Sequence, residues 1–119
     1  MSYVDGFVVP VPRAKLEAYR AMSQLAGKIW REYGALHFRE CVADDVKSGQ
    51  WTSFPQSVKP EEDEVVVFSW IEWPSKAARD AGMAKFMADP RMTQNTEPMP
   101  FDGKRMFWGG FDPILDERG

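Results

Sequence analysis

The stretch Glu64–Trp73, EVVVFSWIEW, decides the fold that the sequence predicts. It combines β-branched and aromatic residues without glycine or proline, which is typical of a strand inside a sheet. Successive strand residues point to opposite faces of a sheet. Val67 and Ile71 lie on one face, and Phe68 and Trp70 lie on the other. Because both faces are apolar, we expect this strand to be at least partly buried on both sides.

The sequence before this strand contains two further strands and a helix. Residues 3–11 alternate loosely and are rich in Val and Phe, which predicts a strand that closely spaced prolines end. Apolar residues recur at intervals of three and four over residues 13–33, which predicts a long helix that Gly34 stops. Residues 36–46 predict the next strand.

The sequence after the central strand predicts a helix and a last strand. Ser75 has the side chain of an N-cap, and a helix is predicted from Lys76 to Ala88. Residues 104–111 predict a strand, in which Gly109–Gly110 indicates a bulge or a close backbone approach. The order of elements is therefore β-α-β-β-α-β.

This order is the ferredoxin-like pattern, an α+β fold. With right-handed crossovers it gives a four-stranded antiparallel sheet in the order 4-1-3-2, with both helices on one face. We expect one domain over residues 1–119. The other face of so apolar a sheet needs a cover, and a homodimer packed sheet against sheet supplies one. A polar ligand pocket between the sheet and the helices is the alternative.

Composition and charge exclude several classes of protein. The chain has 119 residues, of which 44% are hydrophobic and 28% are charged, and its net charge is −3. These values argue against a disordered chain, and the acidic balance argues against a nucleic-acid partner. Neither a long apolar run nor a signal peptide is evident, so we expect no membrane segment and a cytoplasmic protein. The basic residues between Arg13 and Glu32 are interpreted as a solvated helix face.

Four side chains are candidates for acid–base catalysis. Histidine titrates nearer neutrality than other side chains, and His37 is the single one in the chain. Glu72, Glu40 and Asp5 stand in predicted strands, where burial under a dimer favours the protonated carboxyl group unless an arginine pairs with it. Each has a structural alternative: a hydrogen-bonded histidine, or a carboxylate paired with an arginine such as Arg39.

Two long predicted loops, residues 47–63 and 89–103, meet at one end of the predicted sheet, where binding sites often form. The alternative is that their aromatic rings only cover the core. One histidine and one cysteine do not make a zinc site, so we expect no metal and no cofactor. The cysteine, Cys41, is interpreted as a small buried apolar residue. The candidate ligand-binding residues are Trp51, Phe54, Trp70, Arg91 and Asn95.

Several long segments, in order, resemble one known family. They are YVDGFVVPVP (3–12), GKIWREYGALHFRECVADDV (27–46), TSFP (52–55), VVFSWIEWPSKAARDAGMAKFMADPRM (66–92) and PMPFDGKRMFWGGF (98–111). Over essentially its whole length the chain resembles the YbaA-like family, domain of unknown function 1428. The resemblance implies the dimeric α/β-barrel superfamily, in which ferredoxin-like chains pair through their sheets.

The family resemblance supplies no reaction, so no catalytic residue is carried over from it. Superfamily relatives include cofactor-independent monooxygenases, haem-degrading enzymes and small-ligand-binding regulators, which is analogy at the level of the fold. Our first hypothesis is a cofactor-independent small-molecule enzyme, monooxygenase-like by that analogy. The alternative is a non-catalytic ligand-binding or interaction module. An apolar pocket of at least ~300 Å³ with two or three inward polar groups favours the enzyme, and a filled interior favours the module.

Overall fold

The computed structural model of the chain describes residues 2–119. Its elements follow the predicted order, with short helices added between them. The strands are β1 (Tyr3–Pro12), β2 (His37–Val42), β3 (Glu64–Trp73) and β4 (Phe107–Phe111). The long helices are α1 (Leu16–Glu32) and α3 (Lys76–Ala88). The short helices are the 3₁₀ turn η1 (Arg13–Lys15), α2 (Phe54–Val58) and α4 (Pro90–Thr93).

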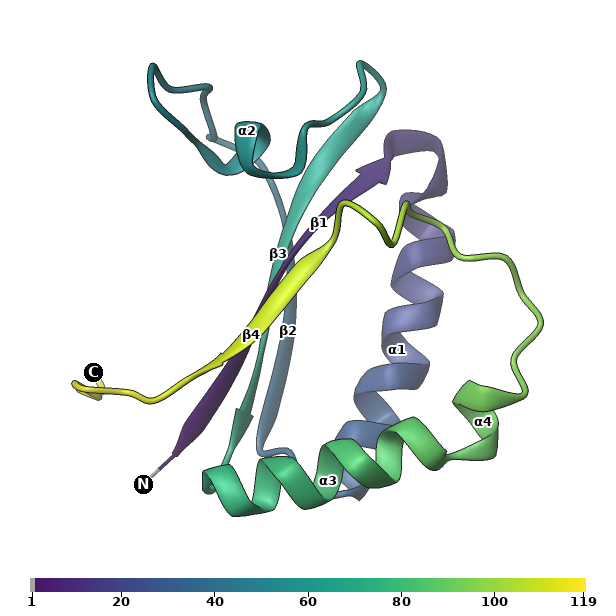
Figure 1. Ribbon diagram of the computed structural model, residues 1–119, viewed down its shortest axis with the longest axis vertical. Coiled ribbons are helices and arrows are strands. Elements are labelled where there is room, and N and C mark those ends of the chain that lie inside the picture. Colours follow the sequence, from purple (N-terminus) through teal and green to yellow (C-terminus); the bar gives the residue numbers. More distant parts are fainter. Residues whose placement is uncertain (1) are drawn as a thin grey trace.

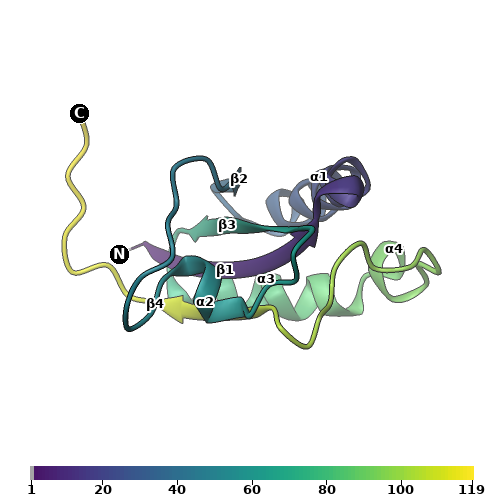
Figure 2. The same cartoon turned by 90° about the horizontal axis from the view of Figure 1, so that it is seen from above.

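The sheet has the predicted topology. Its strands are antiparallel and lie in the order β2-β3-β1-β4, which is the expected order counted from the other edge. Helices α1 and α3 both lie on one side of the sheet (Figures 1 and 2). These observations confirm the α+β ferredoxin-like class. The side of the sheet turned away from α1 and α3 is called the open face below.

Several elements begin and end where the sequence pattern predicts, whereas the predicted first strand is one residue too short. Strand β3 and helix α3 begin and end at the predicted residues, and the Ser75 hydroxyl caps α3 by accepting a hydrogen bond from the Ala78 N–H. Gly34 has the expected positive φ, 113°. Strand β1 continues to Pro12 because β4 pairs only with Val4–Val8, so a proline beyond Val8 needs no partner on that side.

Strand β2 and the two predicted loops differ from the expectation. The strand ends at Val42 rather than at Val46, and each loop contains a short helix. Ser53 caps α2 by accepting a hydrogen bond from the Gln56 N–H, and Asp89 caps α4 in the same way. Both short helices have a proline in their first turn. These capping signals are local, and the prediction of open loops overlooked them.

The main core lies between the sheet and the two long helices, and a smaller buried cluster of Val8, Val58 and Val66 packs under α2 on the open face. Ile29 of α1 and Ile71 and Trp73 of β3 have no exposed surface. The Trp30 ring of α1 stacks on Phe86 of α3, with 4.4 Å between ring centroids. One continuous apolar layer therefore joins both helices to the middle of the sheet.

Candidate functional site

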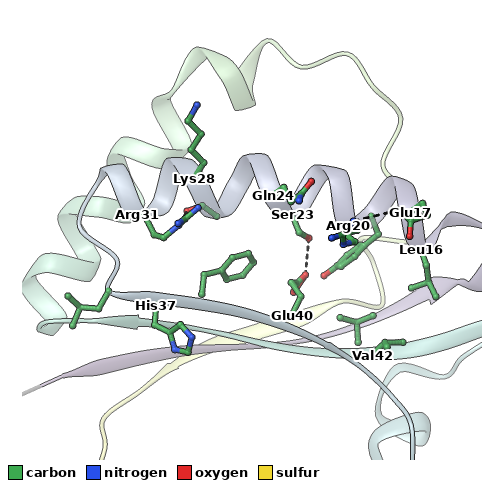
Figure 3. A pocket seen from close by; sticks show the side chains of 15 residues that line it. Leu16, Glu17, Arg20, Ser23, Gln24, Lys28, Arg31, His37, Glu40 and Val42 are labelled. Atoms are coloured by element: carbon green, nitrogen blue, oxygen red, sulfur yellow. Dashed lines mark hydrogen bonds and ion pairs between the residues drawn. The ribbon is translucent and has the colours of Figure 1, made fainter.

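A groove of about 910 Å³ lies between helix α1 and the edge strand β2. Figure 3 shows the helix on one side of this groove and the strand on the other. The β2 side chains that enter it are Phe38, Glu40 and Val42, because alternate strand residues point toward α1. Ser23 and Leu16 are among the residues that face them from α1.

A polar pair lies in the middle of this groove. The Ser23 hydroxyl donates a hydrogen bond of 2.9 Å to the Glu40 carboxylate. Burial, and then the negative charge and hydrogen bonding of Glu40, raise the pKa of the Tyr19 hydroxyl far above its ordinary value. Tyr19 therefore keeps its proton near neutral pH. The interior of the groove thus combines one carboxylate with two hydroxyl groups.

The helix side of the groove carries a row of basic residues. Arg20, Gln24 and Lys28 follow at intervals of four and so share one stripe of α1, with Arg31 next along it. Within residues 2–119 neither Lys28 nor Arg31 forms an ion pair. The Arg31 guanidinium donates to a backbone carbonyl, that of Gly27, at 3.1 Å. This row is the local exception in a chain of net charge −3.

The strand side of the groove is largely apolar and exposed to solvent. Leu36 and Val42 are both more than half exposed. The Phe38 ring packs edge-on against Trp30, with 5.0 Å between centroids. Gly27 of α1 allows this packing, because a Cβ there would meet the Phe38 ring. The apolar wall therefore continues inward to the core.

Asp5, one of the catalytic candidates, lies outside the groove in a buried network. Its carboxylate has no exposed surface and accepts hydrogen bonds from the Arg79 guanidinium at 2.8 and 3.1 Å. It also accepts one from the Trp73 indole N–H at 3.0 Å. The Arg79 guanidinium lies against the rings of Tyr3 and Trp108. An arginine-paired carboxylate of this kind holds structure together and is closed to substrate.

The candidates His37 and Glu72 lie side by side on the open face. They are register partners on β2 and β3. The His37 ring packs edge-on against Trp70, at 6.5 Å between centroids, and points away from α1 (Figure 3). The Glu72 carboxylate accepts a hydrogen bond of 3.3 Å from Arg118. Arg39 on the same face lies over the Trp70 ring.

The candidate ligand-binding residues of the loops do not come together. Trp51 is almost fully exposed, and the Phe54 ring packs on Phe68 of the open face. The Asn95 side chain accepts a hydrogen bond from the Glu97 N–H within its own loop. Among the described residues no hydrogen bond, ion pair or ring contact joins Trp51 or Phe54 to Arg91 or Asn95.

Arg91 is held elsewhere, at the C-terminal end of α1. Its guanidinium pairs with Glu32 at 2.7 Å and with Asp89 at 2.9 Å. The hydrogen bonds from Arg91 and then from Tyr33 lower the pKa of the Asp89 carboxyl group. Arg91 therefore joins α4 to α1. The loop that carries it begins at the end of the sheet opposite to the 47–63 loop and runs back to the other end before it enters β4 (Figure 1).

Two further expectations concern metal and membrane binding. Among residues 2–119 no group of three or more His, Cys, Asp and Glu side chains could hold a metal ion. No helix of the described chain is long and apolar enough to cross a membrane. Cys41, expected to be buried, is only partly buried, because its side chain lies on the open face opposite Phe68.

Sequence reasoning found Glu40 but missed its surroundings. Ser23 was not singled out, and the basic residues of α1 were interpreted as a solvated face. They are indeed exposed, but three of them also line the groove. The spacing of Arg20, Gln24 and Lys28 places them on one stripe. That spacing was the available signal, although it does not say which strand the stripe faces.

Solved structures with the same fold place the protein in its class. A dimeric ferredoxin-like protein from an uncultured marine organism is similar with a TM-score of 0.59 and 10% identity, covering 98% of this chain and 100% of that one. A variant of MhuD with two manganese protoporphyrin IX molecules per active site is similar with a TM-score of 0.58 and 20% identity, covering 98% and 99%. These likenesses define a ferredoxin-like α+β protein.

The family follows from sequence. The model described as "Protein of unknown function (DUF1428)" matches residues 2–103. The uncharacterized protein YbaA of Escherichia coli K12 is 57% identical over 117 residues, covering 98% of this chain and 100% of the relative, and YbaA of Shigella flexneri is equally similar. The chain belongs to the DUF1428 family, which confirms the resemblance seen in its sequence.

Proposed function

We propose that this protein binds a small organic molecule in the groove between α1 and β2. The observation that carries the proposal is an open, mostly apolar groove with the Ser23–Glu40 hydrogen bond in its interior. Its volume of about 910 Å³ falls within the range of ligand sites, roughly 300–1,000 Å³. A few polar groups converging in an apolar pocket are what orients a bound molecule.

We propose Glu40 as the acid–base group of this site. Its side chain points into the groove toward α1, whereas Asp5 is paired and Glu72 lies on the open face. His37 also lines the groove, but its ring is turned away from α1 (Figure 3). A carboxylate beside neutral hydroxyls can take a proton from a bound substrate and return it. This arrangement supports the enzyme hypothesis and leaves the reaction unnamed. A binding module would use Glu40 only as a hydrogen-bond acceptor.

A thermal-shift screen with a metabolite library tests the proposed site. We expect compounds that stabilise the wild type to lose their effect in Gln24→Trp, which puts an indole ring at the mouth of the groove. Gln94→Trp is the matched control, because Gln94 ends α4 outside the groove and should leave the shifts unchanged. Glu40→Gln separates acid–base chemistry from binding, since it removes the charge and keeps the shape. Stabilising compounds unaffected by Gln24→Trp would place binding elsewhere.

We also propose that the protein is a homodimer that pairs through the open face. Three aromatic residues on this face are partly exposed in one chain: Phe68 at 40%, Phe107 at 47% and Phe111 at 64%. They lie on β3 and β4, the strands on either side of β1, in register with Val8 and Val4 of β1. Contiguous apolar surface of this kind is rare on a monomer and common in interfaces. A similar solved structure is described as dimeric.

Sedimentation of the purified protein tests this dimer. We expect the wild type to sediment as two chains and the double variant Phe68→Glu and Phe111→Glu to sediment as one, because the interface would bury unpaired carboxylates. Met87→Glu is the control, since Met87 is an exposed apolar residue of α3 away from the open face. A wild type that stays a single chain at high concentration would contradict the dimer.

We propose that the protein is cytoplasmic and forms one domain. The single cysteine, Cys41, cannot form a disulfide within the chain, which suits a reducing compartment. The shared core between the sheet and both long helices supports one folding unit.

A further inference from the structure

We propose that the ligand of this groove is a small amphipathic anion, with its carboxylate at Lys28 and Arg31 and its apolar body along β2. This inference rests on the proposed binding function and specifies the class of ligand. The inference rests on the different side chains at the two ends of the groove (Figure 3).

One end of the groove is basic. Lys28 and Arg31 stand at the end of the groove where β2 begins with His37, and the Lys28 side chain extends away from β2, so its flexible stem turns back to meet a bound carboxylate (Figure 3). Within the described chain neither cation forms an ion pair with a carboxylate. A carboxylate on a bound molecule gains charge-assisted hydrogen bonds from both. By contrast, Arg79, Arg91 and Arg105 each hold a carboxylate of the chain.

The other end of the groove has an apolar surface beside the exposed Arg20–Glu17 ion pair. Leu16 of α1 and Val42 of β2 lie there together (Figure 3). Arg20, the cation nearest this end, lies 3.9 Å from the Glu17 carboxylate. A hydrocarbon or aromatic body at this end removes exposed Val42 surface from water, at about 25 cal/mol per Å².

The middle of the groove fixes the direction of the ligand. Glu40 lies there as a carboxylate hydrogen-bonded by Ser23, so a second carboxylate at the same place would be repelled. Between Ser23 and Lys28 the helix rises about 7.5 Å. An anion at Lys28 therefore stays clear of Glu40, and a neutral donor on the ligand can reach it. The three zones together accept a molecule that is anionic at one end and apolar at the other.

Calorimetric titration with three matched probes tests this inference. The probes are 4-phenylbutanoate, 4-phenylbutan-1-ol and 4-phenylbutylammonium, which share one body and differ in charge. We expect the acid to bind at least about tenfold more tightly than the alcohol and the amine, the gain typical of a hydrogen bond to a charged group. Amide chemical shifts of Ser23, Lys28 and Glu40 should move on binding.

Two double variants make the test specific. Lys28→Gln with Arg31→Gln should lower the affinity for the acid to that for the alcohol and leave the alcohol unchanged. Lys47→Gln with Lys85→Gln removes the same charge from exposed positions outside the groove and should preserve the selectivity.

The remaining outcomes overturn the inference in distinguishable ways. Equal affinity for acid and alcohol, both blocked by Gln24→Trp, refutes the anionic class and leaves the binding site standing. Selectivity for the acid that survives loss of Lys28 and Arg31 refutes the assigned carboxylate position. Absence of acid binding refutes the inference outright, whereas the library screen with Gln24→Trp decides the binding site independently.

Discussion

Replacing Asp5 by alanine is expected to lower the free energy of unfolding by about 3–5 kcal/mol, the range for breaking a buried ion pair. The Asp5 carboxylate has no exposed surface and holds both the Arg79 guanidinium and the Trp73 indole N–H. Without it, Arg79 keeps the exposed Asp80 as its carboxylate partner, and the indole N–H loses its acceptor. Urea unfolding at fixed protein concentration measures the loss.

A double-mutant cycle separates the pair from its surroundings. Asp5→Ala combined with Arg79→Met should cost clearly less than the sum of the two single changes, because the buried charge and its partner then leave together. Asp80→Ala is the matched control: it removes the exposed partner of the same guanidinium and should cost under about 1 kcal/mol. A loss for Asp5→Ala no larger than that for Asp80→Ala would show that the network adds little stability.

The role of Asp5 shows that a local sequence pattern does not identify partners that are distant in the chain. Its partners Trp73 and Arg79 lie 68 and 74 positions along the chain. The local sequence shows that Asp5 is a polar residue in an apolar strand. It does not decide between a catalytic carboxyl group and a carboxylate paired with an arginine. The choice between a catalytic and a paired carboxylate is made by tertiary structure.

The elements that were predicted end to end are those whose signals are local. Strand β3 is an unbroken β-branched and aromatic stretch, and α3 has its cap at Ser75. The residues of the expected loop site are separated for a related reason. Asp89 and Pro90 start a helix, and Arg91 then pairs with Glu32 of α1, which takes this loop away from Trp51.

The groove could be predicted only in part from the sequence. Glu40 was singled out from its place in a strand, but alternation alone does not say that its side chain enters a groove under α1. The basic stripe of α1 follows from spacing, and its position opposite β2 does not. Ser23 could be recognised as a site residue only from the structure, because its importance lies in the hydrogen bond that it donates to Glu40. A pattern identifies the faces of an element, and packing decides what each face meets.

Gly82→Ala is expected to destabilise the protein by about 1–3 kcal/mol, the range for overpacking a core. Helix propensity alone predicts the opposite sign, a gain of roughly 1 kcal/mol, because Gly82 lies inside α3. A Cβ at Gly82 would meet ring carbons of Trp73 and, at 2.8 Å, the backbone carbonyl of Tyr33. Trp73 is fully buried and anchored by Asp5, so its ring cannot move aside.

Gly27→Ala is the matched comparison for this prediction. Gly27 is a buried glycine of α1, and the neighbour of its added Cβ is the Phe38 ring. Phe38 is only partly buried and faces the groove, so its ring has room to shift. We therefore expect Gly27→Ala to cost less than Gly82→Ala in the same urea unfolding experiment. If Gly82→Ala instead stabilises the protein, α3 does not pack against Trp73 as closely as described, because only a gap above the indole ring would let helix propensity decide the sign.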